Sequence, residues 1–337
     1  MLEDILQSTK HSLIISDAFT KADSVLNHMG YANISCSISG GADSDICMDI
    51  CEKVKPHGVR YVWFDTGIEY QATKDHLTYL EKKYNITIDR RNAVVPVPMS
   101  NKTYGEPFLS KYVSEMISRL QRHGFDWKDE PYETSVQKYP NCKAALKWFN
   151  NQYGDYSQFK YSRFDISGQR YLREFLISNP PEFQISARCC DGAKKNVAKK
   201  YIKESGTELM ILGLRKSEGG VRAGAYHNCF SASTKKGISE YRPIFWFKDE
   251  DRKEYENLFH IRHSRCYTEY GLRRTGCAGC PYGGKELTKE LAAIETYEPK
   301  LCKAVKNIFH DSYEYTRKYY EFRKMMEVKE KNNGDSD

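Results

Sequence analysis

Residues 34–46, Ile-Ser-Cys-Ser-Ile-Ser-Gly-Gly-Ala-Asp-Ser-Asp-Ile, decide the fold of this chain. An alternating strand runs into two glycines, and an Asp-Ser pair then opens a helix with apolar residues at helical spacing. Such a strand, turn and helix N-terminus form an anion pocket, because the first-turn N–H groups have no helical partner and the helix dipole is positive there. The glycines let backbone approach a phosphate, and the serine hydroxyls add donors. No Gly-Lys-Ser/Thr follows, so this is not a Walker loop.

The segment Ser39-Gly40-Gly41-Ala42-Asp43-Ser44 resembles the Ser-Gly-Gly-x-Asp-Ser loop of the PP-loop ATP pyrophosphatases. The resemblance implies that this loop holds the pyrophosphate part of ATP and that chemistry occurs at the α-phosphate. The residues it places at the nucleotide are Ser39, Gly40, Gly41, Asp43 and Ser44, and it also places Asp43 in catalysis. The alternative is a glycine-rich turn without a ligand, since short glycine motifs recur by chance.

Composition sets the class of protein. The chain has 337 residues, of which 40% are hydrophobic and 29% charged, enough for one large domain with an insertion or two moderate domains. No apolar run approaches the roughly 20 residues that span a bilayer and no secretory signal is visible, so we expect a cytoplasmic protein without membrane association. Eleven cysteines in such a chain favour metal or thiol chemistry for some of them. The net charge of +7 permits an anionic partner, although a solvated basic surface explains it equally well.

Two strand–helix units in succession predict the fold class. Residues 59–64 form a near-continuous apolar run, as expected of a buried parallel strand, and Asp65-Thr66-Gly67 ends it. Residues 76–84 predict a helix, and 86–88 the next strand. We therefore expect an α/β fold with a doubly wound parallel sheet, Rossmann-like and of the HUP type that the resemblance implies. Such sheets bind ligands at the carboxyl ends of their strands.

The predicted organisation follows from where this pattern breaks. An aromatic-rich helical insertion interrupts it, and the pattern resumes with a helix at 196–205 and a strand at 208–212. We interpret the aromatic residues as packing for short helices; stacking of nucleic-acid bases is the alternative. The predicted parts are the first half of the α/β domain (1–102), the insertion (103–185), the second half with a cysteine metal site (186–284), C-terminal helices (285–328) and a disordered polar tail (329–337).

Two further segments resemble the phosphoadenosine phosphosulfate (PAPS) reductase branch of the PP-loop family. Trp-Phe-Asp-Thr-Gly at 63–67 matches its second-strand motif. Gly-Leu-Arg-Lys-Ser-Glu-Gly-Gly-Val-Arg at 213–222 matches its Gly-x-Arg-x-x-Glu-Ser-x-x-Arg segment, with Gly219 in place of Ser. Two arginines there are candidate bidentate phosphate clamps, with solvated surface arginines as the alternative. The resemblance places Asp65, Arg215 and Arg222 in catalysis, and Asp65, Thr66, Gly213 and Arg215 at the nucleotide.

The cysteine pattern predicts a metal site. Cys189-Cys190 and Cys277-Ala278-Gly279-Cys280-Pro281 match the Cys-Cys plus Cys-x-x-Cys pattern of the family's iron–sulfur members. Two thiolates three residues apart can bind one side of a metal centre, and a pair distant in sequence can supply the remaining ligands. The expected ligands are Cys190, Cys229, Cys277 and Cys280, with Cys189 or Cys266 as alternatives to Cys229. The resemblance favours a 4Fe–4S cluster, with zinc as the alternative, because ligand spacing alone fits both.

The resemblance leaves three functions open. Reductases of the PAPS branch carry a nucleophilic cysteine in a C-terminal Glu-Cys-Gly-Leu motif, whereas the last cysteine here, Cys302, lies in a helical context. We therefore expect an ATP pyrophosphatase that hydrolyses ATP or transfers AMP from it with release of pyrophosphate, in sulfur transfer to a nucleic acid, using ATP and Mg²⁺. A sulfonucleotide reductase with another thiol and a non-catalytic nucleotide-sensing adaptor are the alternatives. The expected partners are a nucleotide (ATP or PAPS-like), a nucleic-acid acceptor and a partner protein subunit.

Overall fold

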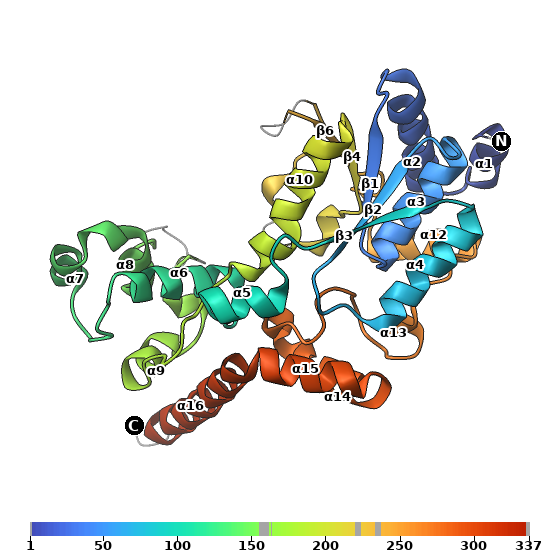
Figure 1. Cartoon of the computed structure of the whole chain (residues 1–337). Helices are drawn as coiled ribbons and strands as arrows, with labels where there is room; N and C mark the ends of the chain where they lie inside the picture. The colour runs from blue at the N-terminus through green and yellow to red at the C-terminus, as the bar shows by residue number, and fades with distance from the viewer. Residues whose placement is uncertain (1, 155–161, 163, 220–223, 233–236, 335–337) are drawn as a thin grey trace. The chain divides into compact units, whose positions relative to one another are not determined.

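The chain folds into two compact units, each assembled from segments that are separate in the sequence (Figure 1). The structure is a computed structural model and describes residues 2–154, 162, 164–219, 224–232 and 237–334. Unit 1 comprises Met1–Val94, Ala193–Ala278 and Ala293–Glu298, and unit 2 comprises Val95–Gly192, Gly279–Ala292 and Pro299–Asp337. The insertion predicted at 103–185 lies within the first of the unit 2 segments.

Unit 1 is built on a six-stranded sheet with the strand order β3-β2-β1-β4-β6-β5. All neighbouring strands are parallel except the short edge pair of β5 and β6. The strands are β1 (Ile34–Ile38), β2 (Arg60–Asp65), β3 (Ile88–Asn92), β4 (Leu209–Leu212), β5 (Phe230–Ser231) and β6 (Ser239–Tyr241). The parallel α/β sheet predicted from the sequence is confirmed. Because β2 and β4 flank β1, the order of the strands reverses at β1, where such sheets form a crevice for ligands.

Helices cover both faces of this sheet (Figure 1). On one face Cys36 and Tyr61 of the strands pack with Ile46 of α3 in the main core, to which α2, α4 and α12 also contribute. On the other face Val62 and Met210 pack against α10. Both faces are apolar, which explains why the strand sequences are near-continuous apolar runs. The helices of this unit are α1 (Leu2–Ser8), α2 (Leu13–Asp23), α3 (Ala42–Val54), α4 (Gln71–Tyr84), α10 (Asn196–Ser205), α12 (Asp249–Leu258) and α13 (Arg265–Thr268), with helical turns at Ser24–His28 and Lys216–Glu218.

Unit 2 is helical and has its own aromatic core. Phe108, Trp148 and Phe175 are fully buried there, together with Tyr315 and Tyr319 of the last helix. The aromatic residues of the insertion therefore pack short helices, as predicted. The helices are α5 (Val97–Tyr104), α6 (Lys111–Arg122), α7 (Tyr132–Lys138), α8 (Lys143–Phe149), α9 (Leu172–Ser178), α15 (Pro299–Ile308) and α16 (His310–Gly334), with turns at Pro140–Cys142, Ile166–Gly168 and Pro281–Glu286. The turn Asp191–Lys195 and helix α14 (Leu287–Tyr297) each contribute residues to both units.

Two boundaries differ from the sequence prediction. Strand β3 begins at Ile88 rather than at 86, because Asn85 adopts a left-handed conformation and the Ile86 N–H still bonds to the carbonyl of Glu81 at the end of α4. Helix α16 continues to Gly334, past the predicted end at 328. No helix in the described part of the chain is long and apolar enough to cross a membrane.

Gly213, at the end of β4, packs directly against the start of α3. A Cβ atom at Gly213 would lie 3.1 Å from the backbone of Asp43 and Ser44. We expect Gly213→Ala to lower the free energy of unfolding by about 1–3 kcal/mol, because backbone cannot move aside as a flexible side chain can. Gly224→Ala is the matched control, since nothing lies within 4 Å of its added Cβ. Urea unfolding of both variants tests this, and equal stabilities would contradict the close approach.

Candidate functional site

The Ser39–Ser44 loop is closed by one side chain, Ser44. The Ser44 hydroxyl donates to the Gly41 carbonyl at 2.7 Å and accepts from the N–H groups of Gly41 at 3.1 Å and Ser39 at 3.2 Å. Gly40 has φ +67°, and a Cβ there would lie 2.8 Å from Thr73 Cγ2. The loop therefore needs glycine at 40 for its conformation and serine at 44 for its closure.

Two hydroxyls from distant segments lie over this loop. The Ala42 N–H donates to Tyr267 Oη at 3.3 Å. A Cβ at Gly41 would lie 3.1 Å from Tyr267 Oη and 3.0 Å from Thr275 Oγ1. Sequence reasoning missed both residues as site residues, because only the fold brings them to the loop. Their hydroxyls add two polar groups to the amides of the α3 N-terminus, a setting suited to an anion.

Arg215 binds carboxylates in this structure. Its Nε lies 2.9 Å from Asp43 Oδ1 and its Nη1 lies 2.8 Å from Asp249 Oδ1, and the residue is only 6% exposed. Burial raises the pKa of Asp43 to about 6, although Arg215 lowers it. Two predicted site residues are thus brought together, with Arg215 holding Asp43 at the start of α3. Arg222, the second predicted clamp, lies outside the described residues.

Asp65 and Thr66, at the carboxyl end of β2, make local contacts there. Asp65 Oδ1 accepts from the Gly67 N–H at 2.8 Å, and its Oδ2 lies 3.4 Å from Lys74 Nζ. Thr66 is fully buried and donates to Glu69 Oε1 at 2.6 Å. Asp65 therefore caps the end of β2, and this structural role accounts for an Asp at position 65.

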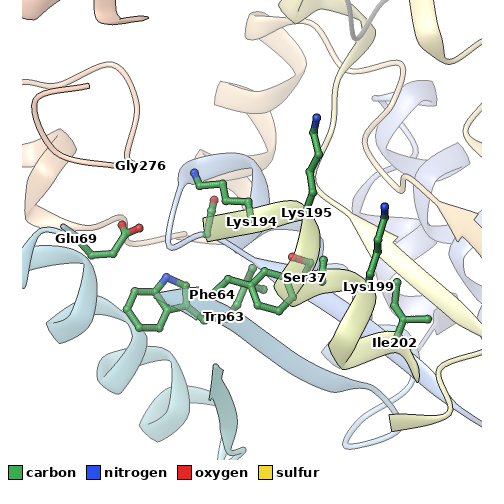
Figure 2. Close-up of a pocket in the computed structure, with 12 residues that line it drawn as sticks. Ser37, Trp63, Phe64, Glu69, Lys194, Lys195, Lys199, Ile202 and Gly276 are labelled. Atoms are coloured by element: carbon green, nitrogen blue, oxygen red, sulfur yellow. The ribbon is translucent and has the colours of Figure 1, made fainter. Parts of the chain in front are cut away.

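A pocket of ≈ 520 Å³ opens at the carboxyl ends of β1 and β2 (Figure 2). Ser39 of the loop lines it. Further lining residues are the aromatic pair Trp63 and Phe64, the carboxylate Glu69, and the lysines Lys194, Lys195 and Lys199. Burial raises the pKa of Glu69, while Lys194 and Thr66 lower it. An excess of ammonium groups beside aromatic rings suits an anionic ligand that also carries a ring.

The four cysteines predicted to hold a metal are divided between the two units. In unit 1, the Cys229 carbonyl accepts from Arg242 N–H beside β6, whereas Cys277 Sγ donates to Thr66 Oγ1 at 3.3 Å beside the end of β2. Strands β1 and β4 lie between β2 and β6, so these positions are roughly 14 Å apart at about 4.8 Å per strand. The structure therefore separates Cys229 from Cys277. The alternative Cys266 is fully buried next to Thr73.

In unit 2, the remaining predicted ligands Cys190 and Cys280 and the alternative Cys189 act electrostatically on one phenol. Burial raises the pKa of Tyr282, a hydrogen bond with Ser114 lowers it, and the nearby thiols of Cys189, Cys190 and Cys280 raise it further. Across the described residues, no three His, Cys, Asp or Glu side chains are arranged to hold a metal ion. The cysteine site stays a prediction from the sequence pattern.

Comparison with known families confirms the resemblance for part of the chain. Residues 33–153 match the family model of the phosphoadenosine phosphosulfate reductase domain. The matched segment contains the Ser39–Ser44 loop and Asp65-Thr66-Gly67, and it ends before the first cysteine pair. No curated protein matches the chain.

Several solved structures are similar over most of their length. Phosphoadenylyl-sulfate reductase from Candida auris, in a phosphate complex, is 14% identical, with 81% of this chain and 93% of that chain covered and a TM-score of 0.43. The NH₃-dependent NAD synthetase from Campylobacter jejuni is 12% identical, covers 90% and 94%, and has a TM-score of 0.35. The U34-tRNA thiolase from Methanococcus maripaludis, with its 4Fe–4S cluster, is 12% identical, covers 92% and 80%, and has a TM-score of 0.37.

Removing the Ser44 hydroxyl tests how the loop is built. Ser44→Ala deletes one donor and one acceptor that serve three backbone groups, so we expect the free energy of unfolding to fall by about 1–3 kcal/mol. Ser110→Ala is a control outside the loop, where the hydroxyl accepts from the Val113 N–H at 3.2 Å. Hydrogen exchange of the amides of residues 39–44 is the measurement. It should accelerate in Ser44→Ala alone, and unchanged protection there would show that the loop is closed by other contacts.

Proposed function

We propose that this protein is an ATP pyrophosphatase of the PP-loop type, which transfers AMP from ATP to an acceptor and releases pyrophosphate. One observation carries the proposal: Ser39 of the loop lines the same pocket as Lys194, Lys195 and Lys199. A triphosphate bound at the α3 N-terminus would have three ammonium groups within the pocket to offset its charge. Trp63 and Phe64 would supply apolar rings beside the nucleoside.

The residues suggest how the transfer would proceed. The loop amides would orient the β- and γ-phosphates so that an acceptor oxygen attacks the α-phosphorus in line with the departing pyrophosphate. One P–O bond forms to the acceptor as the bond to pyrophosphate breaks, and the lysines stabilise the charge on the leaving group. Mg²⁺ would arrive on the phosphates of ATP and neutralise part of their charge.

The finer role that we propose is sulfur transfer to a nucleic acid. Adenylation turns the acceptor oxygen into a leaving group, so a sulfide can form the carbon–sulfur or phosphorus–sulfur bond as AMP departs with that oxygen. The sequence resemblance to PP-loop enzymes motivates this role. The PAPS-reductase alternative requires an attacking thiol, and the thiol of Cys302 in α15 is only 2% exposed.

Labelled ATP distinguishes the candidate functions. ATP labelled at the α-phosphate should give AMP or an adenylated acceptor together with pyrophosphate if the protein is a transferase. A nucleotide sensor would bind ATP without forming either product. A reductase would release sulfite from PAPS in the presence of a thiol donor, and that result would replace the proposal.

The pocket lysines provide a test with a control on the same helix. Lys199 lines the pocket, whereas Lys203, one turn further along α10, is exposed and is not part of its wall. We expect Lys199→Ala to raise the Kd for ATP about tenfold, or about 1.4 kcal/mol, through loss of a charge-assisted contact. Lys203→Ala should leave the Kd unchanged. Equal effects of the two substitutions in calorimetry would indicate only a general effect of charge.

The predicted cofactor is tested by purification without oxygen. The Cys-x-x-Cys pattern leads us to propose a 4Fe–4S cluster, which would colour the protein brown with absorption near roughly 400 nm. Cys280→Ser should abolish the colour. Cys229→Ser should preserve it, because Cys229 packs against the sheet core. Colourless protein with one equivalent of zinc would reverse the metal assignment, and protein with neither metal would refute the site.

A further inference from the structure

A buried carboxylate, Asp45, directly follows the loop. The Asp45 N–H donates to the Gly41 carbonyl at 3.0 Å, in the first turn of α3. Its side chain is 1% exposed. Any group that binds this carboxylate therefore also holds the loop end of α3.

Two imidazoles share one oxygen of this carboxylate. His76 Nε2 of α4 and His263 Nδ1, from the segment before α13, each lie 2.9 Å from Asp45 Oδ2. The two side chains are 3% and 13% exposed. Because an ionised carboxylate oxygen only accepts hydrogen bonds, each ring must carry a proton on the nitrogen that faces it. Two segments distant in sequence, α4 and the segment before α13, therefore converge on Asp45 of α3.

The second ring nitrogen of His263 lies at ion-pair distance from a second carboxylate, without an aligned hydrogen bond. His263 Nε2 lies 3.0 Å from Glu256 Oε1 of α12. A neutral imidazole has a single N–H, so a ring with an acidic oxygen at each nitrogen is favoured as the doubly protonated cation. Burial lowers the pKa of His263, but Asp45 and Glu256 outweigh it and raise the pKa to about 9.

Glu256 connects this cation back to the loop. Arg252 Nε lies 3.1 Å from Glu256 Oε1, and Arg252 Nη1 lies 3.9 Å from Asp43 Oδ1. Charges of alternating sign thus run from Asp45 through His263 and Glu256 to Arg252 and Asp43, and both ends lie on the first turn of α3. The ionisable groups around His263 are Asp45 of α3, His76 of α4, Glu256 and Arg252 of α12, and Tyr267 of α13.

We propose that protonated His263 is a positioning residue that holds the first turn of α3, and with it the Ser39–Ser44 loop, in its anion-binding geometry. That the loop binds a nucleotide rests on the proposed function. When His263 loses its proton, one N–H remains for the carboxylates of Asp45 and Glu256, so one of the two carboxylates is left beside a ring nitrogen that carries only a lone pair. The positive charge beside the loop disappears at the same time. The pKa of His263 is raised on folding, so this stabilisation is complete below about pH 6.5 and is lost as the pH rises through about 9.

ATP binding by the full-length protein between pH 7.5 and 9.5 tests the proposal. ATP keeps a constant charge in this range, since the last phosphate proton is lost near about pH 6. We expect the affinity of the wild-type protein to fall by about fivefold or more across the range. His263→Asn retains an amide N–H near the Nδ1 position but has no proton to lose, so its affinity should hardly change with pH. His28→Asn is the control, because His28 has a side chain that is 70% exposed and pairs with Asp23.

Histidine NMR provides a readout that does not depend on nucleotide binding. The ring signals of His263 should titrate near pH 9 in the wild-type protein. Glu256→Gln should lower that midpoint by about one unit, because the ring loses a facing charge. A midpoint near the ordinary value of about 6.5, or no shift in Glu256→Gln, would overturn the inference. An equal fall in affinity with pH in His263→Asn would overturn it as well.

The two proposals can fail separately. If the wild-type protein binds no ATP at any pH, the proposed function is refuted, while the His263 titration still reports on the charge network. If ATP binds but His263 titrates normally, the proposed function stands and the positioning role is lost. Circular dichroism of each variant verifies that it is folded.

Discussion

The pairing of β1 with β2 on one side and β4 on the other is the constraint from which the site follows. Helix α3, which follows β1, and helix α10, which precedes β4, cover opposite faces of the sheet. A crevice therefore remains at the carboxyl end of β1, where the order of the strands reverses. The glycine loop occupies that position: Ser39 lines the pocket, while the N–H groups of Gly41 and Ala42 bond to Ser44 and Tyr267.

Positive charge is distributed over this crevice in a way that the motifs do not reveal. Arg215, which resembles a phosphate clamp in sequence, is engaged by Asp43 and Asp249. The cations that line the pocket come from one continuous run, the Asp191–Lys195 turn and α10. Arg215 bridges two carboxylates. The fixed, planar geometry of a guanidinium suits this role better than the single ammonium group of lysine. The lysine side chains line the wall of the pocket.

The sequence predicted the features that depend on neighbouring residues. The apolar run at 59–64 and the helix at 196–205 are local patterns, and so is the Ser39–Ser44 loop, which Ser44 closes within its own segment. Strand β3 was misplaced because Asp89 and Arg91 pair with each other on an exposed edge, which leaves little apolar signal. The Arg215–Asp43 pair and the position of Tyr267 over the loop join residues far apart in sequence. The position of Cys229 depends on the strand order, which a single sequence does not contain.

The composition of unit 2 has a consequence for how the protein is made. Its core joins Phe108, in the first of its segments, to Tyr315 near the end of the chain, with ring centroids 4.9 Å apart. During synthesis the apolar faces of α6, α8 and α9 emerge long before α16, which completes their packing. Contacts of such sequence separation form slowly, and incompletely packed intermediates expose surface that favours aggregation. Until α16 is synthesised, the aromatic core of unit 2 therefore stays incompletely packed.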